Sequence, residues 1–74
     1  MPELDRSLIY QARKFITGAN VHCVKTWIFC YETSKPQTST RGRYESLLRE
    51  FVASNNLLLA RSRLVEPGLQ RMRH

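Results

Sequence analysis

The first part of the chain carries one apolar stripe at helical spacing. Its apolar residues follow one another mostly at steps of three or four: Leu4, Leu8, Ala12 and Phe15, with Ile9 and Ile16 alongside. This spacing places the side chains on one side of an α-helix. A proline and two acidic residues at the start suit a helix N-terminus, and Gly18 suits the residue that follows a helix. The pattern predicts a helix over residues 2–17.

A polar loop at residues 33–40, which contains Pro36, precedes a second apolar stripe. The members of this stripe are Tyr44, Leu47, Leu48, Phe51 and Val52. One of the hydroxyl side chains at residues 38–40 is expected to cap the helix that they predict. Glu45 and Arg49 are four residues apart and opposite in charge, which stabilises a helix.

The C-terminal part is predicted to form one more short helix before a basic tail. Residues 54–56 form a break or a second helix cap, apolar residues dominate positions 57–65, and Glu-Pro-Gly at 66–68 ends the pattern. We expect one domain over residues 1–66 and a basic tail over residues 67–74. The helix at 57–65 is more apolar than a monomer of this size needs, which predicts a homodimer contact.

Residues 18–31 allow two interpretations. They are rich in strand-forming residues, but Lys25 falls in the same alternating row as Trp27 and Phe29, and no other segment offers a partner strand. As a helix, the segment places an apolar row at steps of three, four and three: Val21, Val24, Ile28 and Tyr31. Asn20 is a suitable N-cap. We favour the helix, so the expected fold is all-α, a small bundle of four to five short helices.

The two cysteines raise the question of a metal or redox site. Cys23 and Cys30 are seven residues apart, which is ~10 Å along a helix and too far to share one zinc or form a disulfide. We favour buried thiols that pack as small hydrophobes. The chain also lacks a nucleophile–base arrangement or a carboxylate pair. We therefore expect no metal, no cofactor and no enzymatic activity.

The charge points to a partner that carries phosphates. Twelve Lys and Arg against six Asp and Glu give a net charge of +6 and a pI near 10.0. Nine of the cations are arginine, whose planar fork suits phosphates and guanine edges. A basic surface kept for solubility, or one that meets an acidic protein, is the alternative. No apolar run approaches the ~20 residues of a membrane span and no signal-peptide pattern is present. We expect a cytoplasmic protein without a membrane partner, nucleoid-associated if it binds DNA.

The spacing in residues 9–52 resembles the helix-turn-helix of DNA-binding proteins of the Cro and phage-repressor type. In that family a turn glycine precedes the recognition helix, an apolar residue follows six positions later, and an aromatic residue often sits three beyond it. Gly18, Val24 and Trp27 match these offsets. Lys14 stands where the family usually has a small residue. The resemblance implies that the bundle contains a helix-turn-helix, whose second helix enters the major groove.

The resemblance also implies roles for the polar side chains. The residues that it places on base edges are Asn20, His22, Lys25 and Thr26, and those that it places on phosphates are Arg13, Lys14, Arg41 and Arg43. Asparagine can pair with adenine and lysine can reach guanine, whereas phosphate contacts set the register. The apolar side of the same helix, which includes Trp27, is expected to pack against the first helix.

The function expected from these patterns is sequence-specific DNA binding by a small regulator or accessory factor of the phage or plasmid type. One alternative is an RNA-binding protein, for duplex RNA, that uses the same cations without reading bases. The other is a small helical inhibitor or adaptor that docks its apolar helices on a protein partner.

Overall fold

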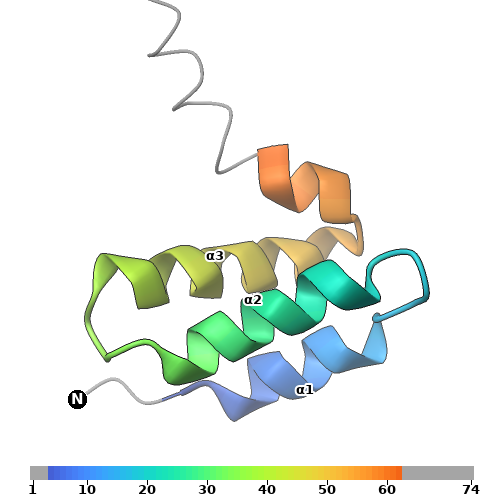
Figure 1. Cartoon of the computed structure of the whole chain (residues 1–74). Coiled ribbons are helices and arrows are strands. Elements are labelled where there is room, and N and C mark those ends of the chain that lie inside the picture. The colour runs from blue at the N-terminus through green and yellow to red at the C-terminus, as the bar shows by residue number, and fades with distance from the viewer. Residues whose placement is uncertain (1–3, 63–74) are drawn as a thin grey trace, which may run out of the picture.

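The structure is a computed structural model that describes residues 4–62, and every regular element within this range is a helix. Helix α1 spans Arg6–Lys14, α2 spans Val21–Thr33 and α3 spans Ser39–Ser54. Residues 57–62 form a further helical segment (Figure 1). The all-α prediction is confirmed, and residues 21–33 form a helix rather than a strand. The predicted tail at 67–74 lies outside the described residues.

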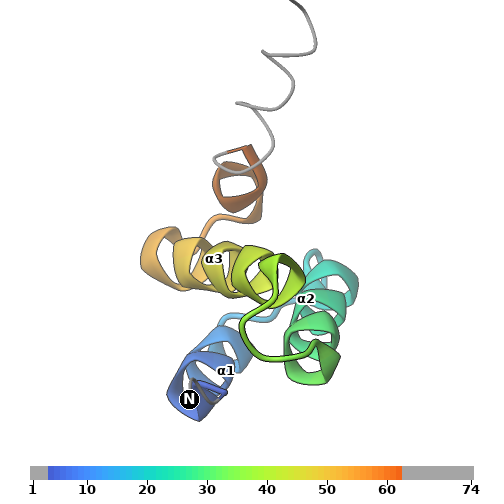
Figure 2. The same cartoon turned by 90° about the vertical axis from the view of Figure 1, so that its left-hand side faces the viewer.

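Successive helices run in alternating directions along the bundle (Figure 1). Figure 2 shows α1 and α2 on one side of α3 and the segment 57–62 on its other side. The start of α2 therefore lies beside the end of α1, and the start of α3 lies at the opposite end of the bundle. This arrangement decides which surface residues can act together.

Helix α1 is shorter than the predicted helix because a cap fixes its start. The Oδ1 atom of Asp5 accepts a hydrogen bond from the Leu8 N–H at 3.0 Å, which makes Asp5 the N-cap and leaves Leu4 outside the helix. At the other end, the Phe15 N–H bonds to the Ala12 carbonyl at 3.1 Å. This tighter last turn ends the helix at Lys14, three residues before the predicted end.

Helix α3 has a capping residue at each end. Thr38 is the N-cap, and its Oγ1 accepts a hydrogen bond from the Arg41 N–H at 3.2 Å. Asn55 adopts the left-handed conformation with φ of 51°, and its N–H bonds to the Phe51 carbonyl at 2.6 Å. Asparagine is one of the residues that tolerate this helix-ending geometry. The predicted break at 54–56 is confirmed at residues 55 and 56, whereas Ser54 still belongs to α3.

The core lies between the three helices and is entirely apolar within residues 4–62. Its buried members are Leu8, Ile9, Ala12, Val24, Trp27, Ile28, Tyr31, Leu47, Leu48, Phe51 and Ala60. Trp27 is only 7% exposed, so its predicted place in the core is confirmed. The prediction that α2 packs against α1 needs correction. Helix α2 packs mainly on α3, and its contact with α1 is smaller.

Residues 57–62 cover one end of the core with part of their surface. Ala60 is fully buried and Leu57 is half-buried, whereas Leu58 is 74% exposed. The rest of the helix predicted at 57–65 lies outside the described residues. Within residues 4–62, no helix has the length and the apolar character that crossing a membrane requires.

Candidate nucleic-acid interface

A groove of about 250 Å³ runs between α1 and α2 on the outside of the bundle. Its lining comes from one residue of α1 and four of α2: Arg13, Lys25, Ile28, Phe29 and Glu32. Because α1 and α2 run in opposite directions, the end of α1 lies beside the first half of α2. This places Arg13 against residues that are distant from it in the sequence.

The floor of the groove is apolar and its rim is charged. Ile28 is buried in the core, whereas the ring of Phe29 is 64% exposed. Phe29 lies one helical turn after Lys25 and close to one turn before Glu32, so all three side chains lie along the same side of α2. An exposed aromatic ring thus stands between a cation and a carboxylate.

The two cations of the groove have no partner within the described residues. Arg13 and Lys25 are exposed, and the ion pairs of residues 4–62 involve neither of them. His22 is also exposed and lies one turn before Lys25 and Thr26. The Thr26 hydroxyl donates to the His22 carbonyl at 2.9 Å, a bond that leaves its own acceptor lone pairs available. The structure therefore brings four of the predicted DNA-binding residues to one surface.

The side chain of Asn20 is already engaged in hydrogen bonds within the chain. Its Oδ1 accepts a hydrogen bond from the Thr17 N–H at 2.8 Å, and its Nδ2 donates to the Phe15 carbonyl at 3.4 Å. It occupies the N-cap position of α2 but makes no side-chain capping bond to that helix. The amide holds the connection between α1 and α2 together, which gives Asn20 a structural role in this connection. Its contact with adenine stays a prediction.

Arg41 also has an internal role. Its guanidinium donates to the Ser34 carbonyl and lies 5.5 Å from the centre of the Tyr31 ring. Its Nε is buried and has no hydrogen-bond partner. Arg41 therefore fastens the loop before α3 to the core. Of the two arginines predicted to contact phosphates at this end of the bundle, Arg43 is exposed and Arg41 is half-buried.

Lys14 belongs to a different surface from Arg13. Its ammonium group lies 4.7 Å from the centre of the Tyr10 ring, and both residues line a hollow between α1 and α3. The predicted site is thus divided into three parts. Arg13 and Lys25 lie together, Lys14 lies on the far side of α1, and Arg43 lies at the opposite end of α2.

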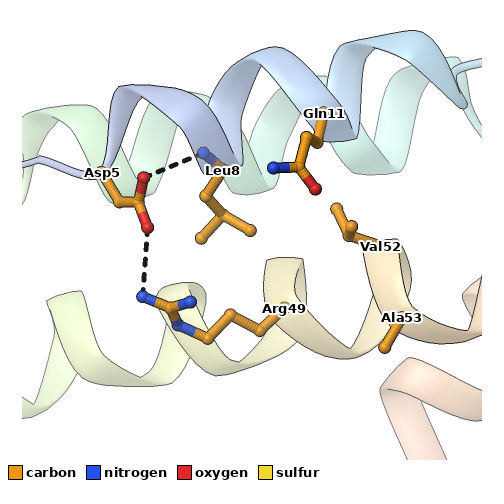
Figure 3. Close-up of a pocket in the computed structure, with 6 residues that line it drawn as sticks. All are labelled: Asp5, Leu8, Gln11, Arg49, Val52 and Ala53. Carbon is orange, nitrogen blue, oxygen red and sulfur yellow. Dashed lines mark hydrogen bonds and ion pairs between the residues drawn. The ribbon is translucent and has the colours of Figure 1, made fainter.

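A second groove, of about 180 Å³, lies between α1 and α3 (Figure 3). Here Arg49 points at Asp5 with 3.2 Å between Nη2 and Oδ2. The same guanidinium lies 2.7 Å from a Glu45 carboxylate oxygen, which confirms the predicted pair of Glu45 and Arg49. The hydrogen bond to Glu45 raises the pKa of Arg49 further above its ordinary value. With two carboxylates around it, this cation is neutralised and offers little to a phosphate.

The cysteines do not form a metal centre in the described part of the chain. Cys23 and Cys30 are both free and half-buried. Within residues 4–62, no three His, Cys, Asp or Glu side chains come together as metal ligands would. Cys30 instead neighbours Tyr44, and the hydrogen bond between them, with a smaller effect of burial, raises the pKa of Tyr44.

The connection between α1 and α2 has features that a helix-turn-helix does not usually show. It contains six residues, 15–20, against the usual three or four. Gly18 has no positive φ, and a Cβ atom built on it would meet nothing within 4 Å. The backbone thus does not require glycine at this position. The resemblance to Cro-type proteins stays a prediction.

Besides the buried Ile28, two residues of the groove, Phe29 and Glu32, were not among the predicted site residues. The helical spacing of residues 20–31 already places Phe29 away from the apolar row, which was the available signal for an exposed ring. Glu32 has no such signal, because only the packing of α1 beside α2 brings it into the groove with Arg13.

Comparison with known proteins adds no relative on which a function can be based. No known protein family matches this chain, and neither curated proteins nor solved structures give a match. The function therefore has to be argued from the groove and its charges.

Proposed function

We propose that this protein binds nucleic acid through the α1–α2 groove and the adjoining exposed side of α2. The observation that carries the proposal is the pair of exposed cations, Arg13 and Lys25. Neither of them forms an ion pair with a carboxylate within residues 4–62. Two cations held close together on rigid helices suit neighbouring phosphates, because neutralising phosphates releases their condensed counterions. The net charge of +6 provides attraction over longer distances.

DNA is the partner that we propose, in a regulatory or accessory role. The preference for DNA over RNA rests on the resemblance to Cro-type proteins. His22, Lys25 and Thr26 are exposed on the first two turns of α2, where a recognition helix usually carries the residues that contact bases. Asn20 is left out of the proposed interface because its amide is bound to the preceding turn.

A binding experiment with two charge-matched double variants tests the proposal. The protein is titrated into a labelled random DNA pool at near-physiological salt, with RNA as competitor. We expect the Arg13→Gln/Lys25→Gln variant to lose about tenfold or more in affinity. The Lys35→Gln/Arg43→Gln variant removes the same charge from two exposed positions that do not line the groove, and its affinity should stay near that of the unmodified protein. Equal losses in both variants would point to binding by overall charge alone, and no binding by the unmodified protein would end the proposal.

We also propose that a second copy of the chain contacts the exposed leucines of residues 57–62. The supporting observation is that Leu58 and Leu59 are 74% and 38% exposed on a helix whose other side is held in the core by Ala60. Sedimentation equilibrium should give twice the monomer mass, and Leu58→Glu should return it to the monomer mass. A monomer at every concentration tested would contradict this part.

A further inference from the structure

Phe29 is an unusual residue at the centre of a charged surface. Its ring is 64% exposed, although the neighbouring positions Trp27 and Ile28 are 7% and 3% exposed. The remaining large exposed apolar residues of the described chain are Tyr10, Leu58 and Leu59, and none of them lines this groove. Phe29 is therefore isolated and is surrounded by charged groups, which is unlike the contiguous apolar patch of a protein-docking surface.

The charges around the ring are arranged in order along α2. Lys25 precedes Phe29 by one turn and Glu32 follows it by almost one turn, and Arg13 reaches the same groove from α1. A nucleotide has the matching order, because its phosphate and its base lie on opposite sides of the sugar. The phosphate suits Lys25 and Arg13, and the flat face of the base suits the Phe29 ring. This stacking requires an unpaired base, because the faces of bases within a duplex are covered by their neighbours.

We propose that the α1–α2 groove binds single-stranded nucleic acid, with one unpaired base stacked on Phe29. This inference rests on the proposed binding of nucleic acid by the groove, and it puts an unpaired strand in place of the duplex that the resemblance to Cro-type proteins implies. The groove volume of about 250 Å³ is below the ~300–1,000 Å³ of pockets for whole small molecules, and it suits one planar ring system.

The carboxylate of Glu32 gives this site a preference among bases. Glu32 is half-buried, and its carboxylate forms no ion pair or hydrogen bond with another described residue. A carboxylate accepts hydrogen bonds and gives none, so it favours a base edge with an exocyclic amino group. Cytosine carries such a group at N4, where a thymine carries a carbonyl oxygen that the carboxylate repels. The groove should therefore bind oligo(dC) more tightly than oligo(dT).

The test uses fluorescence anisotropy with labelled single-stranded dC and dT oligonucleotides and a duplex of equal length. Phe29→Leu keeps an apolar side chain but removes the ring, and it should weaken single-strand binding about tenfold, as the loss of one base–aromatic stack does. Tyr10→Leu is the matched control, because Tyr10 is 63% exposed but lies on the side of α1 that faces α3. We expect it to bind as the unmodified protein does. Glu32→Gln should remove the preference for dC over dT, because an amide can donate to the thymine carbonyl.

The outcomes separate this inference from the function on which it rests. Full single-strand affinity in Phe29→Leu, or tighter binding of the duplex than of either single strand, would overturn the stacking proposal and leave nucleic-acid binding by the cations in place. Equal affinity of the unmodified protein for dC and dT would overturn the role of Glu32. No binding of any oligonucleotide would mean that the proposed function itself is wrong. Thermal melting of each variant shows that the fold is retained, since all three side chains lie outside the core.

Discussion

The α1–α3 groove and the α1–α2 groove both contain basic side chains, but within the described residues these are paired with carboxylates only in the first. On the α3 side, Arg49 lies between Asp5 and Glu45, and its charge is compensated inside the molecule. On the α2 side, Arg13 and Lys25 share a groove with a single carboxylate, and neither forms an ion pair within residues 4–62. A count of basic residues treats these cations alike. Their surroundings show that the first one fastens two helices and that the other two are available to a partner.

The same contrast holds for the aromatic residues of α2. Trp27→Ala should destabilise the protein by ~3–5 kcal/mol, because it leaves a cavity where a buried ring packs. This is a large part of the ~5–15 kcal/mol that stabilises a small domain. Phe29→Ala, two residues later, should change the free energy of unfolding by less than ~0.5 kcal/mol. Urea denaturation followed by circular dichroism measures both, and similar losses in the two variants would contradict the exposure of Phe29.

Asn20 lies next to the α1–α2 groove in sequence, and its role can be tested by substitution. Asn20→Ala should lower the free energy of unfolding by ~1 kcal/mol, because the Thr17 N–H loses its acceptor and the Phe15 carbonyl loses a donor. Affinity for nucleic acid, measured where the variant is fully folded, should not change. A selective loss of affinity for one DNA sequence would restore the base contact that the helix-turn-helix resemblance implies.

Arg49 provides the corresponding test on the α3 side. Arg49→Met removes the ion pairs with Asp5 and Glu45, and we expect it to cost ~0.5 kcal/mol of stability, because the pairs are partly exposed to solvent. The loss should shrink as salt is added. Because Arg49 makes no phosphate contact in this account, the oligonucleotide affinity of Arg49→Met should stay constant or rise slightly. A clear drop in affinity would show that the α3 side of α1 also binds nucleic acid.

Gly18 tests the geometry of the connection between α1 and α2. Gly18→Ala is expected to raise the free energy of unfolding by ~0.4 kcal/mol or leave it unchanged, because the position has no positive φ and has room for a Cβ atom. Replacing a glycine that a helix-turn-helix turn requires would instead lower the free energy of unfolding. A loss of ~1 kcal/mol or more in thermal or chemical denaturation would favour that turn and bring α2 back as a major-groove helix.

Periodicity in the sequence predicts the helices because each helix buries one stripe of apolar residues. The spacing of Val24, Ile28 and Tyr31 favours a helix over a strand, and the structure confirms the helix. Helix ends were less predictable, since the sequence pattern starts the first helix at residue 2, whereas the bond from the Leu8 N–H to the Asp5 side chain fixes its start after Asp5. Local sequence patterns do not show which helices pack together. The pattern therefore predicts α1 as the packing partner of α2, whereas α3 is its main partner in the structure.

The candidate site was predictable only in part. Lys25 and His22 follow from the helical phase of α2, and Arg13 from its position before the turn. Asn20 and Arg41 are polar residues whose hydrogen bonds turn inward, and no pattern in the sequence separates them from exposed ones. Glu32 enters the groove through the contact of two helices, which becomes visible only once the chain is folded.

The most direct test of the difference between the two sides of α1 is the salt dependence of nucleic-acid binding. The slope of log affinity against log salt concentration counts the phosphates that a protein neutralises, at ~0.7 per phosphate for single strands. We predict that Arg13→Gln/Lys25→Gln lowers the magnitude of the slope on a single-stranded oligonucleotide by ~1.4, whereas Arg49→Met leaves it unchanged. An unchanged slope in the double variant, or an equal fall per removed charge in Arg49→Met, would contradict the claim that the α1–α2 groove is the binding surface.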